Sequence, residues 1–311
     1  MHPTDHFHPR DSFDVKLAHH FAGYKPLAVA VVFPCDPVSL RGAVLAAHRG
    51  HIRPVLVGPE DRISEMAASC GLDIEDIDIL DVELDVDAAE TAARLAGQGE
   101  VKALMKGSLH TNDLMRAIVA REAGLRTARR MSHVFVIDQA NYHKPLLVTD
   151  AALNIAPTLV EKRDIVQNAI DLAQQLGITM PKVALLAAVE TVEENIESTI
   201  HAAALCKMAD RKQIRGGILD GPLALDNALS QEAARIKGID SPVAGDADIL
   251  VVPNYEVGNV LAKNMEHMGG ARTGGIVLGA KVPVILTSRS DSEQARVASC
   301  LLAQAWVTGV R

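Results

Sequence analysis

The sequence predicts an α/β fold in two domains. Short apolar, β-branched runs alternate along the chain with longer stretches of helical period, which is typical of βα units and of a parallel sheet covered on both faces. The length of 311 residues suits two compact domains better than one. Because no Gly/Ser or Pro linker separates two halves, we expect the chain to cross between domains more than once, at 151–157 and near Pro283.

The candidate strands follow from the apolar runs. In chain order they are Leu27–Phe33, Pro54–Val57, Val101–Met105, Val134–Ile137, Leu146–Val148, Val183–Leu186, Gly217–Leu219, Ile249–Val252, Gly275–Leu278 and Val284–Leu286. Helical segments lie between them, and the clearest is predicted to begin with Pro157 at its first position and to end at Gly177. Its apolar face is made by Leu159, Val166, Ile170, Ala173 and Leu176.

The domain organisation follows from these elements. We expect a flexible N-terminal tail at residues 1–20, a first α/β domain at 21–152 plus 284–311, and a second α/β domain at 153–283. The histidines at the start of the chain, His2, His6 and His8, are interpreted as part of a polar tail rather than as a metal site.

Composition and charge exclude several classes of protein. The net charge of −8 repels nucleic acid and anionic membranes, and few aromatic side chains are present to stack on bases. No stretch approaches the roughly 18 apolar residues of a membrane helix, and the first residues lack the apolar core of a signal peptide. The four cysteines are scattered without a CxxC pair, as in reduced thiols. We therefore expect a cytoplasmic protein.

One basic stretch stands against this acidic background. Residues 101–132 carry seven Lys and Arg side chains against two carboxylates, a net charge of +5. Within it, MKGSLHTND follows a predicted strand and opens a helix, whose N-terminal N–H groups attract phosphate. The candidate binding residues are Lys106, Ser108, His110, Thr111 and Arg116. Ordinary helix capping would also explain the Ser and Thr, but not the cations. The turn matches neither a P-loop nor a GxGxxG fingerprint.

Further candidate ligand-binding residues come from later segments. Arg129 and Arg130 precede a strand that begins near Ser132, and paired arginines match phosphate or carboxylate, although solvated charges would look the same. Asp220 stands in an Asp-Gly-Pro sequence, where it could orient a ligand or simply form a turn. Asn259 lies in the first turns of a predicted helix, where small and amide side chains permit close approach of a ligand.

The candidate catalytic residues lie in VILTSRSDSEQ, directly after a late strand. A doubly wound sheet places its ligands in such loops. Ser288 offers a hydroxyl, Arg289 a guanidinium and Asp291 a carboxylate, which together can hydrogen-bond a polarised oxygen, hold a phosphate and accept a proton. Alternatively, Asp291 or Ser290 caps the last helix. Chemistry is favoured for Arg289, and both interpretations stay open for Asp291.

Together these segments resemble the phosphate acetyltransferase and phosphate butyryltransferase family. The resemblance runs from about Leu27 to the C-terminus and rests on LMKGSLHTNDLMRA, RRMSHVFVID, LLVTDAALNIAPTL, VALLAAVETVEENIESTIHAAALCKMADR, GILDGPLALDNALS, PNYEVGNVLAKNMEHMGGA and VPVILTSRSDS. It implies a two-domain isocitrate/isopropylmalate dehydrogenase-like fold with parallel or mixed sheets and an interdomain cleft. It also implies reversible acyl transfer between coenzyme A and inorganic phosphate, and a homodimer or higher oligomer.

The resemblance also assigns roles to residues. Arg289 would bind the phosphoryl group, Ser288 the reacting carbonyl or thiol, and Arg116 the phosphates of coenzyme A. In acetyltransferase members the catalytic Asp stands several residues further on, where an ungapped alignment puts Ala295. The butyryl-type SRxD spacing supplies Asp291 as the base instead, and the match as a whole looks closer to the butyryl branch.

The implied reaction is direct transfer of an acetyl to butyryl group, in which the coenzyme A thiolate attacks acyl phosphate. No tightly bound cofactor and no metal are expected, because Arg289 already supplies a cation to the leaving phosphate. One alternative is a coenzyme A-binding regulatory relative without catalysis. Another is a metal- and NAD-dependent dehydrogenase of the same fold, for which Asp220, Asp246 and Asp248 form a weak set of metal ligands.

Overall fold

The computed structural model describes residues 25–288 and 291–309. The chain forms two compact units, unit 1 from Met1–Leu125 and Val284–Thr308 and unit 2 from Arg126–Pro283 and Gly309–Arg311. The sequence placed the first boundary at 152/153, whereas the contacts divide the chain after Leu125. The segment between these positions contains two strands that pair within the sheet of unit 2, which explains the difference.

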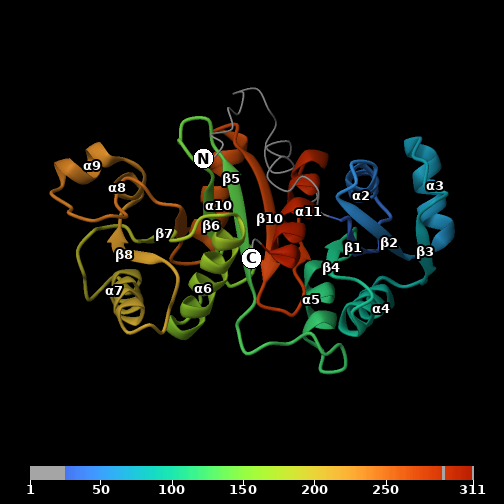
Figure 1. Ribbon diagram of the computed structural model, residues 1–311, viewed down its shortest axis with the longest axis horizontal. Coiled ribbons are helices and arrows are strands. Elements are labelled where there is room, and N and C mark those ends of the chain that lie inside the picture. The colour runs from blue at the N-terminus through green and yellow to red at the C-terminus, as the bar shows by residue number, and fades with distance from the viewer. Residues whose placement is uncertain (1–24, 289–290, 310–311) are drawn as a thin grey trace. The chain divides into compact units, whose positions relative to one another are not determined.

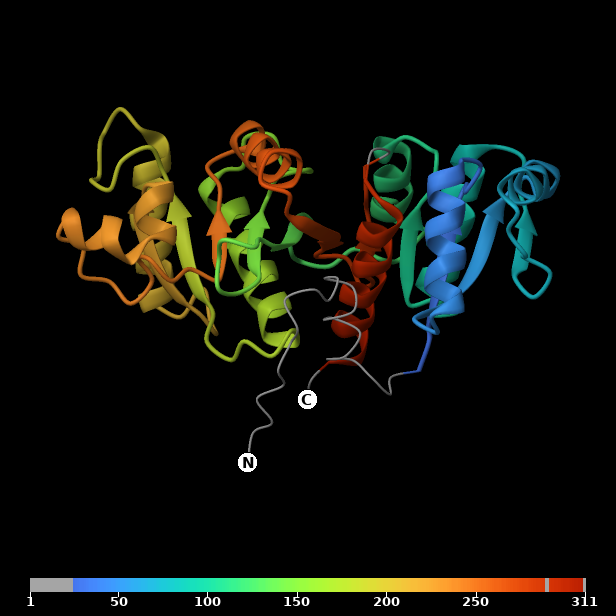
Figure 2. The ribbon, with the colours of Figure 1, turned by 90° about the horizontal axis from the view of Figure 1, so that it is seen from above.

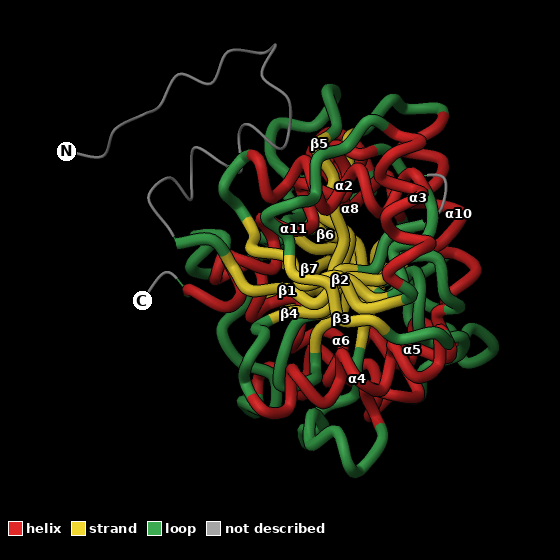
Figure 3. Tube along the Cα trace, turned by 90° about the vertical axis from the view of Figure 1, so that its right-hand side faces the viewer, coloured by secondary structure: helices red, strands yellow, loops and turns green. Residues whose placement is uncertain are grey.

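Unit 1 is built on a parallel sheet with the strand order β3-β2-β1-β4-β11. The strands are β1 (Leu27–Val32), β2 (Ile52–Gly58), β3 (Asp78–Asp81), β4 (Ala103–Lys106) and β11 (Val284–Ile285). The helices are α2 (Pro37–His48), α3 (Glu60–Cys70), α4 (Asp85–Gln98), α5 (Thr111–Val119) and α11 (Glu293–Thr308). Figure 3 shows α2 and α3 on one side of these strands and α4 and α5 on the other. The predicted doubly covered parallel sheet is therefore present in unit 1.

Strand β1 forms the centre of the unit 1 core. Its residues from Val29 to Val32 are fully buried, because helices cover both faces of the sheet at this point. On one face α2 packs against α11, and Figure 2 shows these helices, blue and red, running alongside the sheet. Asp36 caps α2 by accepting hydrogen bonds from the backbone N–H groups of Val38 and Ser39, so the helix starts directly after the loop that follows β1.

Unit 2 contains a mixed sheet with the strand order β10-β5-β6-β9-β7-β8. The strands are β5 (Ser132–Asp138), β6 (Leu146–Thr149), β7 (Lys182–Leu186), β8 (Ile218–Leu223), β9 (Ile249–Val251) and β10 (Arg272–Leu278). The helices are α6 (Leu159–Gln175), α7 (Glu197–Asp210), α8 (Leu225–Leu229), α9 (Gln231–Ile236) and α10 (Tyr255–His267). β5 runs antiparallel to β6 and β10, and the remaining pairs are parallel. Figure 1 shows β8 between α7 on one side and α8 and α9 on the other.

Two expectations about the elements were wrong. The helix expected to begin at Pro157 begins at Leu159, because Thr158 and Glu161 form a capping box that fixes its start. Strand β3 was missed, because its sequence DILD offers only two apolar residues between two carboxylates. Such charges are common on an edge strand, where they discourage pairing with other chains. None of the helices within the described residues has the length and apolar character needed to cross a bilayer.

Candidate functional site

The carboxyl ends of three parallel strands meet at one edge of the unit 1 sheet. β1 lies beside β4 and β4 beside β11, with Val32 opposite Lys106 and Ile285 opposite Met105. The loops that leave these strands therefore start close together. They include the basic turn that begins at Lys106 and the loop that contains Ser288, so the fold brings together two segments that are far apart in the sequence.

The basic turn after β4 is held tightly against the end of β1. Ser108 donates hydrogen bonds to the carbonyl of Phe33 from both its backbone N–H and its hydroxyl, at 2.9 and 2.8 Å. A Cβ atom on Gly107 would lie 2.3 Å from the carbonyl oxygen of Val32, so glycine is required there. Lys106 is buried, and its ammonium donates to the Gly107 carbonyl at 3.2 Å. Ser108 therefore shapes the turn that carries the cation.

The turn leads into the N-terminus of α5. His110 occupies the N-cap position without a capping hydrogen bond from its side chain, and Thr111 is the first helical residue. The alternative of ordinary capping concerned the Ser and Thr of this turn, and the N-cap position is held by His110 instead. Arg116 lies further along α5, exposed, with its guanidinium 4.0 Å from Asp113. The N-terminal end of α5 offers backbone N–H groups to an anion, whereas Arg116 is an exposed cation in the last turn of the helix.

The loop after β11 folds into a short hydrogen-bonded turn. The backbone N–H of Ser288 donates to the Asp291 carboxylate at 2.7 Å, and the backbone N–H of Asp291 donates to the Ser288 carbonyl at 3.2 Å. Helix α11 is capped by Ser292, whose hydroxyl accepts from the Ala295 N–H. Capping of the last helix, the alternative role considered for Asp291, is thus performed by its neighbour. Arg289 and Ser290 lie outside the described residues.

The sequence analysis did not identify Arg296, whose side chain is buried and hydrogen-bonded to this turn. Arg296 is 2% exposed, and one of its terminal nitrogens, Nη2, donates to the Ser288 carbonyl at 3.0 Å. Its Nε and Nη1 atoms are buried without a hydrogen-bond partner among the described residues. Burial lowers the pKa of Arg296, while the carboxylates of Asp36 and Asp291 act in the opposite direction. The available signal was an arginine within an otherwise small and apolar helix stretch.

We expect Arg296→Met to lower kcat by about 10- to 100-fold, because a hydrogen bond from a charged group contributes about 1.5–3 kcal/mol. Methionine fills a similar volume but leaves the Ser288 carbonyl without this donor. The KM values for the substrates that the resemblance implies should stay within about twofold, since the change moves the turn rather than a binding contact. Steady-state kinetics measure both values, and Arg296→Lys should recover part of the loss. An unchanged kcat at unchanged thermal stability would mean that Arg296 does not position the turn.

In unit 2 Arg130 contacts the start of α6, whereas Arg129 pairs with Asp171 further along the same helix. Arg130 donates from Nε to the Asn154 side chain at 2.7 Å, and its Nη1 lies 3.2 Å from the Glu161 carboxylate. Ser132 is fully buried, and its hydroxyl accepts a hydrogen bond from Asn168 at 2.8 Å. The Ser132 hydroxyl therefore joins β5 to α6, whereas half of the Arg130 side chain reaches solvent.

Asn259 and Asp220 lie on different parts of unit 2. Asn259, on α10, donates a hydrogen bond to the Ala151 carbonyl at 3.2 Å. Ala151 lies in the segment after β6, and Asn154 in the same segment accepts the hydrogen bond from Arg130. Asp220 lies on β8, separated from β6 by β9 and β7. Its charge acts on Cys206, whose pKa is raised to about 12, first by burial and then by Asp220. Asn259 and Arg130 thus both contact the segment after β6, whereas Asp220 lies on a strand that is not adjacent to β6.

Two of the three acidic residues considered as metal ligands, Asp246 and Asp248, form ion pairs with lysines. Lys144 lies 2.8 Å from the Asp246 carboxylate and 2.7 Å from that of Asp248, and Lys182 also pairs with Asp246. Burial acts to raise the pKa of Asp246, but hydrogen bonds from Lys144, Lys182 and His143 outweigh it and lower the pKa. Within the described part of the chain, no group of three or more His, Cys, Asp or Glu residues could hold a metal ion.

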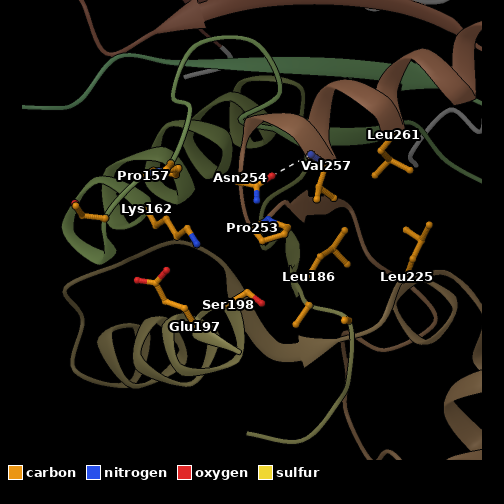
Figure 4. Close-up of a pocket in the computed structure, with 14 residues that line it drawn as sticks. Pro157, Lys162, Leu186, Glu197, Ser198, Leu225, Pro253, Asn254, Val257 and Leu261 are labelled. Carbon is orange, nitrogen blue, oxygen red and sulfur yellow. Dashed lines mark hydrogen bonds between the residues drawn. The ribbon is translucent and has the colours of Figure 1, made fainter. Parts of the chain in front are cut away.

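A cavity of about 570 Å³ lies at the carboxyl edge of the unit 2 sheet. Figure 4 shows side chains from α6, α7 and α10 around it. Its lining consists of Ala156, Pro157, Thr158, Lys162, Leu186, Ala187, Ala188, Glu197, Ser198, Leu225, Pro253, Asn254, Val257 and Leu261. None of the candidate catalytic or binding residues from the sequence analysis lines this cavity. Its polar lining residues lie in separate segments of the sequence, so no single motif indicated them.

Comparison with known proteins places this geometry in a family. Residues 83–304 match the family model described as phosphate acetyl/butaryl transferase. A phosphate acetyltransferase of Rhizobium meliloti is 56% identical over 278 residues, which cover 89% of this chain and 88% of that protein. The crystal structure of a branched-chain phosphotransacylase from Enterococcus faecalis has a TM-score of 0.81 and 33% identity, and the match covers 91% of this chain and 99% of that one.

The identities do not support the expected closeness to the butyryl branch. A phosphate butyryltransferase of Clostridium beijerinckii is 41% identical over 275 residues, 88% of this chain and 91% of that protein. This is less than the 56% shared with the acetyltransferase of Rhizobium meliloti. The butyryl-type SRxD spacing from Ser288 to Asp291 belongs to one short loop, which says little about the similarity of whole chains.

Proposed function

The chain belongs to the phosphate acetyl/butaryl transferase family and is a phosphate acyltransferase, and we propose that it moves an acetyl to butyryl group between coenzyme A and inorganic phosphate by direct attack of the thiolate. The observation that carries this proposal is the turn from Ser288 to Asp291. It contains the Ser288 hydroxyl and the Asp291 carboxylate, at the strand edge where the basic turn of Lys106 also begins.

In the proposed reaction the Asp291 carboxylate accepts the proton of the coenzyme A thiol. The sulfur then forms a bond to the carbonyl carbon of acyl phosphate, and the bond from that carbon to the phosphate oxygen breaks. Ser288 hydrogen-bonds the reacting oxygen as charge develops on it, and Arg289 neutralises the departing phosphate. The proton leaves Asp291 for the phosphate or for solvent, so the carboxylate is ready for the next cycle.

The remaining residues are proposed to bind coenzyme A, which is a substrate rather than a resident cofactor. Lys106, His110, Thr111 and Arg116 offer cations and helix N–H groups to its phosphates. Ser108, through its bonds to Phe33, shapes the turn that presents them.

Unit 2 is proposed to contribute Arg130 and Asn259, with Asp220 at a separate place on β8. Buried Ser132 supports this group by fixing α6 to β5. The homodimer or higher oligomer and the isocitrate/isopropylmalate dehydrogenase-like arrangement also belong to this proposal, and the family resemblance supports them. The cytoplasmic location is proposed from the scattered cysteines of the sequence.

The decisive experiment measures phosphate-dependent release of coenzyme A from acetyl-, propionyl- and butyryl-CoA by the purified chain. We expect turnover with at least one of them, and the acyl chain can be ranked because one methylene in a pocket changes kcat/KM by about 10- to 200-fold. Binding of coenzyme A by calorimetry, without arsenate-dependent cleavage of any acyl-CoA, would instead identify a regulatory relative. Activity that required NAD and a divalent metal would identify a dehydrogenase.

A further inference from the structure

We propose that the cavity in unit 2 between α6, α7 and α10 binds a straight-chain aliphatic monocarboxylate, with its carboxylate on Lys162 and its tail on the leucines opposite. None of the residues proposed to transfer the acyl group or to bind coenzyme A lines this cavity. The inference therefore adds a second ligand site to the one proposed above.

A buried cation without a carboxylate partner is the first reason. Lys162 is only 5% exposed, and its ammonium lies 3.2 Å from Nδ1 of His201. The structure records no ion pair of Lys162 with any described residue, and Glu197 acts on it only from a longer distance. Burial lowers the pKa of Lys162, and Glu197 partly offsets this effect. An anion in the cavity would remove the cost of leaving this charge unpaired.

Polar groups near Lys162 can complete a carboxylate site. Ser198 lines the cavity with a hydroxyl, and Asn254 lines it with an amide whose oxygen is occupied by the Val257 N–H at 3.0 Å. This bond leaves the amide nitrogen of Asn254 as the group that can donate to a ligand. Figure 4 shows the ends of Lys162 and Ser198 on the same side of the cavity. Ammonium, hydroxyl and amide donors together suit an anionic oxygen pair.

The opposite side of the cavity is apolar. Leu186, Leu225, Val257 and Leu261 lie there in Figure 4, away from Lys162. The volume of about 570 Å³ is typical of a small-molecule site. An anion with an aliphatic tail matches both sides of the cavity. Its charge can pair with Lys162, and each methylene buried against the leucines strengthens binding.

The charge balance favours a monoanion. Lys162 supplies one positive charge, and the negatively charged Glu197 also lines the cavity. With Lys162 and Glu197, a carboxylate gives the site a net charge of −1 and a phosphate dianion one of −2, so the dianion meets the stronger repulsion from Glu197. The structure therefore points to a fatty or short-chain carboxylic acid in its ionised form rather than to a phosphorylated compound.

The test is isothermal titration calorimetry of the whole chain with butyrate, hexanoate and octanoate. We expect binding to strengthen by about fourfold per added methylene until the cavity is full. Lys162→Met should weaken octanoate binding by at least about tenfold, because it removes the charged partner but keeps the volume. Lys263→Met, a change of an exposed lysine on α10, should bind like the wild type. Circular dichroism melting confirms that both variants are folded.

Three outcomes would overturn the proposal. Equal octanoate binding by wild type and folded Lys162→Met would remove the lysine from the site. Loss of octanoate binding in Ser288→Ala, or upon saturation with coenzyme A, would place the ligand in the acyl-transfer site. Absence of octanoate binding, together with a wild-type dimer that Leu225→Asp converts to a monomer in sedimentation, would assign the cavity to a contact between two copies. Failure here leaves the proposed acyl transfer unaffected, since its assay does not involve Lys162.

Discussion

Asp291→Asn is expected to lower the turnover of acyl-CoA with phosphate by about 100- to 1000-fold, which corresponds to about 3–4 kcal/mol of transition-state stabilisation. Asparagine has nearly the same shape, and its side-chain oxygen can still accept the hydrogen bond that the Ser288 N–H gives to the carboxylate. The turn should therefore keep its geometry while the proton acceptor is lost. Binding of coenzyme A, measured by calorimetry, should be nearly unchanged.

The pH dependence of Asp291→Asn provides a sharper test. Without a carboxylate to accept the proton, the reaction depends on the fraction of free thiolate, and a thiol ionises with a pKa of about 8.5. The residual rate with acyl phosphate and coenzyme A should therefore rise about tenfold per pH unit below this value. Glu293→Gln, a change two residues away in the first turn of α11, should behave like the wild type. Unchanged turnover of Asp291→Asn would assign the base to another group.

Arg289→Ala is expected to lower turnover by a similar factor, about 100- to 1000-fold, in both the forward and the reverse reaction. The reason is charge: breaking the carbon–oxygen bond leaves phosphate with an additional negative charge, and the side chain of Arg289 is the cation assigned to it by the resemblance. Arg289→Lys keeps the charge but loses the two parallel donors of the guanidinium, so it should recover only part of the rate.

The loss in Arg289→Ala should appear in kcat and in the KM for acyl phosphate, and not in the thermal stability of the chain. Initial rates at varied acyl phosphate, with coenzyme A saturating, separate these effects. Arg53→Ala, which changes an exposed arginine on β2, is the matched control. Wild-type turnover of acyl phosphate by Arg289→Ala would show that the phosphate-binding cation is elsewhere.

Local sequence determined most of the elements and the order of the motifs. Apolar, β-branched runs such as Leu27–Phe33 form strands because a strand buried on both faces must be apolar along its whole length. The end of α6 was also close to its predicted position, because Gly177 has a left-handed backbone that ends a helix readily. The catalytic candidates could be identified because Ser288, Arg289 and Asp291 are neighbours in the chain.

The tertiary structure decided the strand directions and the burial of charged side chains, because both depend on packing between segments that are distant in the sequence. The antiparallel direction of β5 is set by its pairing with β6 and β10, which no local pattern records. Lys162 and Arg296 are buried cations only because other elements pack over them in the folded chain. The sequence by itself thus predicted the family, most of the strands and the class of reaction. The fold decided which charges leave water, because burial is a property of the surroundings of a side chain and not of the side chain itself.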